Sequence, residues 1–170
     1  MATPSRYFHK VPLNQITTLP EPVKVDGILI FRSFDLNMYA SLSGKGDYTL
    51  LDLLNAGGDV MLHISVRCCQ NAIVFNTSTK NTGWGPEEIV ELKGHFEGFN
   101  TTVAIYNHPD MFQIITNGRT AHYFKKRIQG DVAKLSYFTA EGLPSFFSDP
   151  IAVETFKDWG ALVPGSRSGN

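Results

Sequence analysis

The sequence predicts an all-β protein that folds as an antiparallel sandwich or barrel. Short runs rich in apolar, β-branched and aromatic residues recur along the chain, and turn clusters separate them at intervals of about 8 to 14 residues. No window sustains the apolar period and the end signals of a helix. Short strands at this spacing are typical of antiparallel sandwiches and barrels.

Half of the predicted strands end at a turn signal. In chain order they are GILIFRSF (27–34), after the irregular lead-in TLPEPVKVDG; YTLLDLL (48–54), ending at AGGD; DVMLHISVR (59–67), ending at CCQN; NAIVFN (71–76); EEIVELK (87–93); TTVAIYN (101–107), ending at NHPD; MFQIIT (111–116), ending at TNGR; AHYFKKRI (121–128); AKLSYFT (133–139), ending at AEGLPS; and IAVETF (151–156). NHPD and the Asn117-Gly118 pair favour tight hairpins, so we expect consecutive strands to form a meander.

Length and composition limit the class of protein. With 170 residues, of which 42% are hydrophobic, the chain can bury the core of one domain, which we assign to residues 1–160, with 161–170 as a loose tail. Its 15 basic and 16 acidic residues nearly cancel, so no nucleic-acid partner is expected. No window approaches roughly 18 apolar residues and the N-terminus lacks a signal-peptide core, which predicts cytoplasmic synthesis without membrane insertion.

One face of the strand predicted at 59–67 carries an unusual set of polar residues. Because alternate side chains of a strand share a face, His63, Ser65 and Arg67 line up on one side, and the apolar residues between them face the core. The short connection CCQN lets the strand that ends at Asn76 return antiparallel beside them. We therefore expect a polar platform of His, Arg and Asn side chains.

The next segment adds an acidic and an aromatic residue to this platform. Glu87 and Ile89 share a face of the following strand, and Trp84 lies in the loop before it. Carbohydrate hydroxyls need the planar donors and acceptors that these polar side chains supply. The C–H face of galactose can lie against an indole ring, and an axial hydroxyl can be reached by His63 and Arg67 together. The set therefore suits a sugar.

These residues resemble the carbohydrate-recognition core of the galectin family, and within it the fungal galectins. The motifs are His-x-x-x-Arg, then V-F-N, then W-G-P-E-E, between residues 63 and 88, and TTVAIYNHPDMFQIITNG (101–118) continues the pattern. The resemblance covers roughly two thirds of the chain. It implies a two-sheet antiparallel β-sandwich of jelly-roll type, whose concave sheet carries a shallow galactoside groove.

The resemblance also implies a role for each matching residue. His63 and Arg67 would bind the axial O4 of galactose, with Arg67 near the ring oxygen as well. Asn76 and Glu87 would bind O6, and Trp84 would stack beneath the ring.

Two residues depart from the pattern of vertebrate galectins. Ser65, which we also count among the carbohydrate-binding residues, occupies a position where asparagine is common, although fungal members accept a small residue there. Ile89 stands where most galectins have an arginine that binds the second sugar. We therefore expect binding of β-galactosides or modified galactose-containing glycans, without the help of an arginine at the second sugar.

Other interpretations stay open at this point. Taken singly, His63 could be structural, Trp84 a packed loop anchor, and Arg67 with Glu87 a surface ion pair. A galectin-fold interaction module that has lost sugar binding would show the same motifs. So would a lectin for N-acetyl-hexosamine, fucosylated or chito-oligosaccharide ligands.

The residues do not predict an enzyme, a cofactor or a metal site. Glu87 and Glu88 are adjacent on a strand and point to opposite faces, so they cannot form the facing carboxylates of a glycosidase. The adjacent Cys68 and Cys69 offer neither zinc-finger spacing nor the geometry of a structural disulfide.

The resemblance implies a non-covalent homodimer or homotetramer, and fungal members are associated with defence against feeding animals. It leaves non-classical secretion to the extracellular space or cell wall open as the export route. Asn76-Thr77-Ser78 and Asn100-Thr101-Thr102 match the N-glycosylation pattern. Without a signal peptide, both asparagines are expected to stay unmodified.

Overall fold

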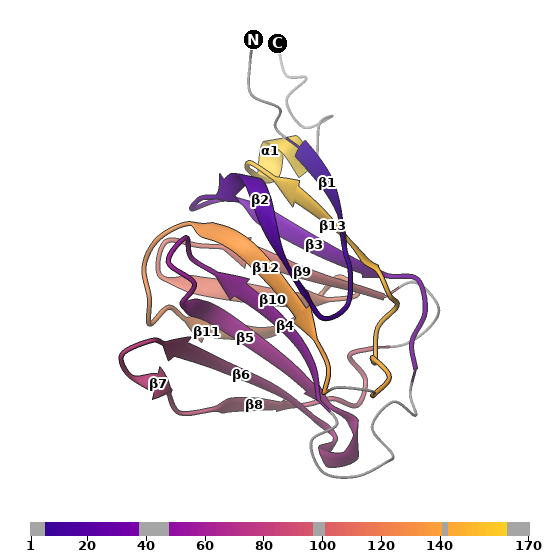
Figure 1. The fold of residues 1–170 in the computed structure, drawn as a ribbon. Helices are drawn as coiled ribbons and strands as arrows, with labels where there is room; N and C mark the ends of the chain where they lie inside the picture. The colour runs from indigo at the N-terminus through magenta and orange to yellow at the C-terminus, as the bar shows by residue number, and fades with distance from the viewer. Residues whose placement is uncertain (1–5, 38–47, 97–100, 141–142, 163–170) are drawn as a thin grey trace.

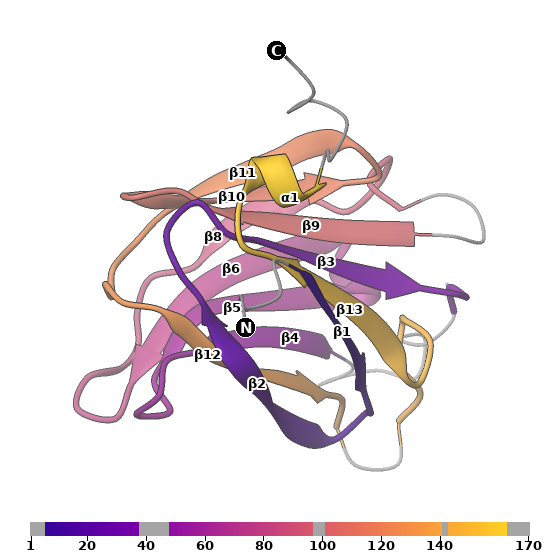
Figure 2. The same cartoon turned by 90° about the horizontal axis from the view of Figure 1, so that it is seen from above.

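The chain folds into two antiparallel β-sheets stacked face to face (Figures 1 and 2). The computed structural model describes residues 6–37, 48–96, 101–140 and 143–162. In spatial order, the first sheet contains β1 (Arg6–Val11), β13 (Ile151–Phe156), β3 (Ile28–Ser33), β9 (Thr101–Asn107), β10 (Met111–Thr116) and β11 (Arg119–Lys125). The second contains β2 (Gln15–Val23), β12 (Val132–Phe138), β4 (Thr49–Leu54), β5 (Val60–Arg67), β6 (Ala72–Thr79) and β7 (Gly83–Trp84), with β8 (Glu88–Glu91) also paired to β6. The predicted two-sheet antiparallel sandwich is confirmed.

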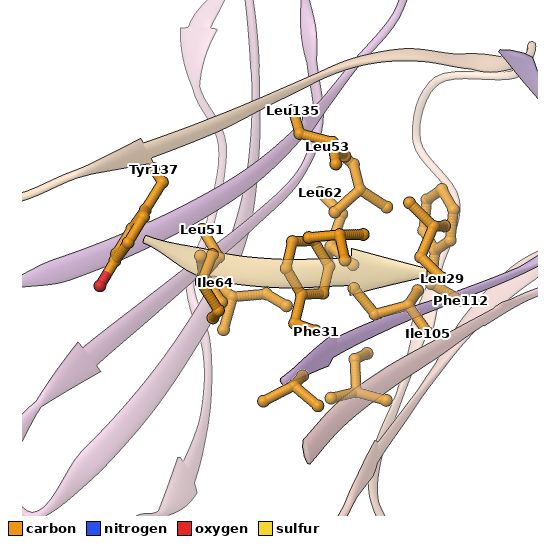
Figure 3. Close-up of a cluster of buried hydrophobic side chains, with 14 of the residues drawn as sticks. Leu29, Phe31, Leu51, Leu53, Leu62, Ile64, Ile105, Phe112, Leu135 and Tyr137 are labelled. Atoms are coloured by element: carbon orange, nitrogen blue, oxygen red, sulfur yellow. The ribbon is translucent and has the colours of Figure 1, made fainter. Parts of the chain in front are cut away.

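Apolar side chains from both sheets meet between the layers. In β5 the alternate residues Leu62, Ile64 and Val66 are buried, as their spacing predicts. The core residues labelled in Figure 3 are Leu29, Phe31, Leu51, Leu53, Leu62, Ile64, Ile105, Phe112, Leu135 and Tyr137. Full burial of one such side chain contributes about 1.5 to 3 kcal/mol to the folded state. The core therefore fixes which face of β5 is turned away from it.

The predicted hairpins are confirmed by turn geometry. In the NHPD turn between β9 and β10, the His108 amide donates to the Met111 carbonyl at 3.0 Å. Asn117 and Gly118 have φ angles of 48° and 82°, the pair of positive values that a two-residue hairpin turn requires. The strands β9, β10 and β11 consequently run as a meander, as do β4, β5, β6 and β7.

A β-bulge interrupts β5 just before its polar residues. Val60 and His63 are three positions apart, whereas their partners on β6, Ser78 and Asn76, are two positions apart. The extra residue lies at Met61 or Leu62, both fully buried. A bulge increases local twist and redirects the strand that follows. It therefore sets the direction in which His63 leaves the sheet.

The stretch TLPEPVKVDG, expected to be irregular, lies largely in strand β2. Two features explain why prolines are accepted there. The strand is at the edge of its sheet, and its register with β12 shifts between the pairs Thr18 with Lys134 and Val23 with Val132. Residues 19–22, with both prolines, therefore lie outside the regular ladder, where missing N–H donors cost little.

Strand β11 ends at Lys125, earlier than the predicted boundary at 128. Its partner β10 begins at Met111, which pairs with Lys125, so the ladder has no further partner. Beyond this point the Lys126 amide donates to the Asp110 carbonyl at 2.9 Å. The segment after Lys125 consequently leaves the regular ladder of β10 and β11.

Two short elements, one near each end of the chain, were not predicted. Strand β1 pairs with β13, and a one-turn helix α1 (Trp159–Leu162) follows β13. The helix spans the expected start of the tail at 161, and residues 163–170 lie outside the described part. In the described ranges, no helix has the length and apolar character needed to cross a membrane.

Candidate functional site

The predicted polar platform lies on the side of β4, β5, β6 and β8 that faces away from the core, here called the polar face. His63 is paired with Asp52 of β4 on one side and with Asn76 of β6 on the other. Residues directly opposite each other in an antiparallel sheet project to the same face. The three side chains therefore lie in one row across the sheet.

His63 is held in one orientation by a carboxylate. Its Nδ1 lies 2.6 Å from Oδ1 of Asp52, and the Ser136 hydroxyl donates to Oδ2 of the same carboxylate at 3.3 Å. A carboxylate only accepts hydrogen bonds, so Nδ1 carries the proton. In the neutral ring this leaves Nε2 as an acceptor for a hydroxyl donor. His63 itself is 7% exposed.

Arg67 is fixed by three contacts. Nε donates to Ser65 Oγ at 3.2 Å, Nη2 donates to Glu87 Oε1 at 3.0 Å, and Cζ lies 4.3 Å from the ring centroid of Tyr48. Arg67 and Glu87 therefore form an ion pair on the polar face. Because the Arg67 side chain is only 15% exposed, this pair differs from a freely solvated surface ion pair.

Ser65 lies beneath this cluster. Its side chain is fully buried, and its hydroxyl accepts from Arg67. Ser65 therefore holds the guanidinium from below, whereas the expected ligand contact of Ser65 stays a prediction.

Asn76 is 4% exposed and its amide is extensively bonded. Nδ2 donates to the Gly85 carbonyl at 2.8 Å, and Oδ1 accepts from the Thr77 amide at 2.8 Å. Oδ1 also accepts from Arg127 Nη1 at 2.9 Å. The amide thus fastens β6 to the segment that carries Trp84 and Glu87.

Trp84 borders the polar face with an exposed ring. It lies in the two-residue strand β7, opposite Ser78, and not in a loop as predicted. The register of β6 extends as far as Thr79, which gives Gly83 a partner. The indole centroid is 4.4 Å from the His63 ring at 55°, and the residue is 56% exposed. An apolar ligand face can therefore rest on it beside His63.

Ile89 provides an apolar surface next to the polar row. It lies on β8 opposite Val74, which in turn is paired with Ser65 of β5. Ile89 is 61% exposed, whereas Val74 is buried. The position has no charged group to offer, as the sequence predicts.

Three contributors were missed by sequence analysis: Asp52, Tyr48 and Arg127. Asp52 is a single acidic residue among the leucines of TLLDLL (49–54), so the sequence gives no pattern that places it beside His63. Tyr48 precedes β4, and Arg127 follows β11, so both lie where strand periodicity gives no direction. Arg127 belongs to the run KKR, which is typical of a solvated surface segment.

The two adjacent glutamates point to different surroundings, as predicted. Glu87 binds Arg67 on the polar face, whereas Glu88 accepts from Arg127 and lies 2.8 Å from His122 Nε2. They do not form a facing pair of carboxylates. Within the ranges that the structure describes, no group of three His, Cys, Asp or Glu could hold a metal ion.

A cavity of about 420 Å³ lies away from the polar face, lined by residues of β1, the β2–β3 connection and the end of β13, such as Tyr7, Val25 and Phe156. Its lining includes none of the polar-face residues described above. The polar face and this cavity are therefore separate features of the surface.

Native protein is expected to carry no glycan on Asn76. Its amide nitrogen is bonded to Gly85 and the residue is nearly inaccessible, so the folded chain does not present the acceptor. An intact mass equal to that of the bare chain, with a tryptic peptide containing unmodified Asn76, is the expected result. A glycan on this asparagine would contradict the described amide contacts. Asn100, the other acceptor, lies outside the described residues.

Comparison with known proteins places these features in a family context. The sequence profile of the family "Galactoside-binding lectin" matches residues 17–142. The chain is 40% identical over 147 residues to Galectin-1 of Coprinopsis cinerea, covering 86% of this chain and 91% of the relative. It is 31% identical over 141 residues to an anti-tumor lectin of Cyclocybe aegerita, covering 81% and 88%. The fold is similar to that of the Caenorhabditis elegans galectin LEC-6, with a TM-score of 0.63, 15% identity, and 92% and 97% of the two chains covered.

Proposed function

Since the chain belongs to the galectin family, the galactoside-binding lectins, we propose that its polar face binds β-galactosides without chemical conversion. The observation that carries this proposal is the combination of the exposed Trp84 ring with oriented His63 and Arg67 side chains beside it. A carbohydrate-binding lectin needs both an apolar platform and fixed polar groups at its edge. Galectins are non-catalytic, and we extend this to the present chain.

The contacts of each group follow from its hydrogen-bonding state. His63 Nε2 accepts from the axial O4 hydroxyl, and Arg67 donates to the same oxygen and to the ring oxygen. The C–H face of galactose lies against Trp84. An equatorial O4, as in glucose, would leave His63 and Arg67 without their shared partner. The site therefore discriminates between the two sugars through groups that cost free energy when left unpaired.

Glu87 and Asn76 bind the primary hydroxyl of galactose. Glu87 is 43% exposed in its side chain and already oriented by Arg67, so it can accept from O6. Asn76 uses one N–H for the Gly85 carbonyl, which leaves its second N–H for the same oxygen.

Affinity for a single site is expected to be weak. Four or five hydrogen bonds of roughly 1 kcal/mol net each and one stacking contact of about 1 kcal/mol must exceed the cost of association. A dissociation constant on the order of 0.1 to 1 mM for a simple galactoside follows.

Strong attachment to a cell surface therefore depends on several linked sites. A homodimer or homotetramer supplies them, and galactose-containing glycoconjugates are the expected partners. Nucleic acid and membrane insertion play no part in this proposal. Cytoplasmic synthesis followed by non-classical secretion to the extracellular space or cell wall would bring the protein to such glycans.

A glycan array probed with the purified protein tests the proposal. Signals confined to structures with an accessible β-galactose, and removed by free lactose, are the expected result. Binding only to N-acetyl-hexosamine, fucosylated or chito-oligosaccharide structures would favour altered specificity. An array without any signal would favour an interaction module that has lost sugar binding.

The exposed Ile89 favours one variation within the galactoside class. An apolar residue lies where the second sugar of a galactoside would extend, opposite the buried Val74. Glycans with an N-acetyl or other apolar group at this position are therefore expected to bind better than lactose. Comparison of lactose with N-acetyllactosamine on the same array measures this preference.

A further inference from the structure

Arg127 contacts the polar face although it does not belong to the sheet that carries this face. It follows β11, in the connection to β12, yet Nη1 donates to Asn76 Oδ1 at 2.9 Å. Nη2 donates to the Pro86 carbonyl at 2.8 Å and to Glu88 Oε2 at 2.9 Å. One guanidinium thus contacts β6, the segment between β7 and β8, and the first residue of β8.

The guanidinium is itself held on several sides. Its Cζ lies 4.8 Å from the centroid of the Phe124 ring, and its side chain is 26% exposed. Glu88 binds it through one oxygen and is 2.8 Å from His122 Nε2 through the other. The His122 ring is stacked on Phe75, with centroids 4.7 Å apart and an angle of 17° between the ring planes. Arg127 therefore has a defined position before any ligand arrives.

This position determines how the Asn76 amide is turned. Oδ1 accepts from two donors, Arg127 and the Thr77 amide, while Nδ2 donates to the Gly85 carbonyl. If the amide were flipped, its NH2 group would face both donors and its oxygen would face a carbonyl oxygen. Each of the three contacts would then be repulsive. Arg127 supplies the charged member of the set, and charge-assisted hydrogen bonds are the stronger kind.

Gly85 gives the guanidinium room to reach Asn76. A Cβ atom at position 85 would lie 2.9 Å from Arg127 Nη1 and 3.4 Å from Asn76 Oδ1. Contacts below 3.0 Å require the neighbour to move. A side chain at position 85 would therefore give a second way to displace Arg127.

We propose that Arg127 is a positioning residue that turns the Asn76 amide so that its remaining N–H meets the primary hydroxyl of galactose. The proposal rests on the proposed function of the polar face. A hydroxyl can accept from Asn76 and donate to Glu87 at once, whereas a sugar without O6 satisfies neither. Arg127 therefore sets the preference of the site for hexoses that carry a 6-hydroxyl.

Calorimetric titration with lactose and with 6′-deoxylactose tests this role. The parent is expected to prefer lactose by about five- to ten-fold, the value of a hydrogen-bonded hydroxyl. Arg127→Met should lose most of that preference, because lactose affinity falls while 6′-deoxylactose affinity stays nearly constant. Arg119→Met is the matched control. Arg119 is exposed on β11 and its side chain makes no hydrogen bond or ion pair with any described residue. An unchanged preference in Arg127→Met would overturn the proposal.

A second readout does not depend on sugar. The side-chain amide of Asn76 should give a slowly exchanging pair of NMR signals in the parent and in Arg119→Met. These signals should shift and exchange faster in Arg127→Met, and Gly85→Ala should reproduce the change. If Arg127→Met does not fold, Gly85→Ala carries the test. Unaltered Asn76 signals in a folded variant would contradict the positioning role. In a further outcome, the parent protein binds neither disaccharide while the Asn76 amide signals still differ between the parent and Arg127→Met. That outcome would refute the proposed function and leave the positioning role of Arg127 intact.

Discussion

Replacing Trp84 with alanine is expected to abolish retention on a galactoside resin while leaving the fold intact. The indole is 56% exposed and forms the apolar platform next to His63, so its removal deletes the largest apolar contact with the sugar. A loss of about ten-fold or more would raise an already weak dissociation constant beyond the millimolar range. His63 keeps its contact with Asp52, so the polar row should survive. Calorimetry with lactose and the thermal unfolding midpoint together measure the effect.

The chain provides a matched control in its second tryptophan. Trp159 is also 56% exposed, but it lies in α1 beside β13, at the end of the sandwich remote from β7 (Figure 1). Trp159→Ala should bind the resin as the parent does. Since Trp84 is then the sole tryptophan, lactose should still change the fluorescence of this variant. Normal retention of Trp84→Ala would show that galactose does not stack on this ring.

Replacing Ile89 with arginine is expected to raise the affinity for lactose by roughly ten-fold. An arginine at this position would lie on the same face as Glu87 and Glu91, two residues to either side, which would orient its guanidinium toward the second sugar. Charged hydrogen bonds of this kind contribute about 1.5 to 3 kcal/mol net, so a gain of roughly ten-fold is the lower end of the expected range. Calorimetric titration of lactose into both proteins measures the gain.

Ile16→Arg controls for the added charge alone. Ile16 is 58% exposed, close to the 61% of Ile89, and it lies on the edge strand β2 of the same sheet. It should leave lactose affinity unchanged. Equal affinities for the parent and Ile89→Arg would mean that another residue already contacts the second sugar, or that this sugar extends elsewhere.

Local sequence patterns predicted the strands that build both layers because burial repeats every second residue. Alternation in 59–67 gave the inner and outer faces of β5 correctly, and Asn117 with Gly118 predicted the turn between β10 and β11. Both features depend on neighbours in sequence, so one chain suffices to detect them. The pairing of Arg67 with Glu87 was likewise predictable once strand order was assumed.

Features that depend on distant segments were not predictable in this way. Asp52 orients His63 from the neighbouring strand β4, 11 residues away, and Arg127 reaches Asn76 from 51 residues away in the chain. Neither contact leaves a local signal, because a lone acidic residue in a strand and a basic run after one are common on any surface. Strand β2 was missed for a different reason. Two prolines close together are typical of a loop, and a strand tolerates them only at the edge of a sheet or at an irregularity, where their missing N–H donors are not needed.

The prolines of β2 also affect how the protein behaves when it is concentrated. β2 is an edge of the sheet that carries the polar face, and an unpaired straight edge is a template on which another chain can add a strand. Pro20 and Pro22 offer no N–H donors, and residues 19–22 leave the regular ladder. A strand from another chain would therefore lack hydrogen-bond donors at Pro20 and Pro22 along this edge. Growth into ordered aggregates is therefore expected to be disfavoured at this edge.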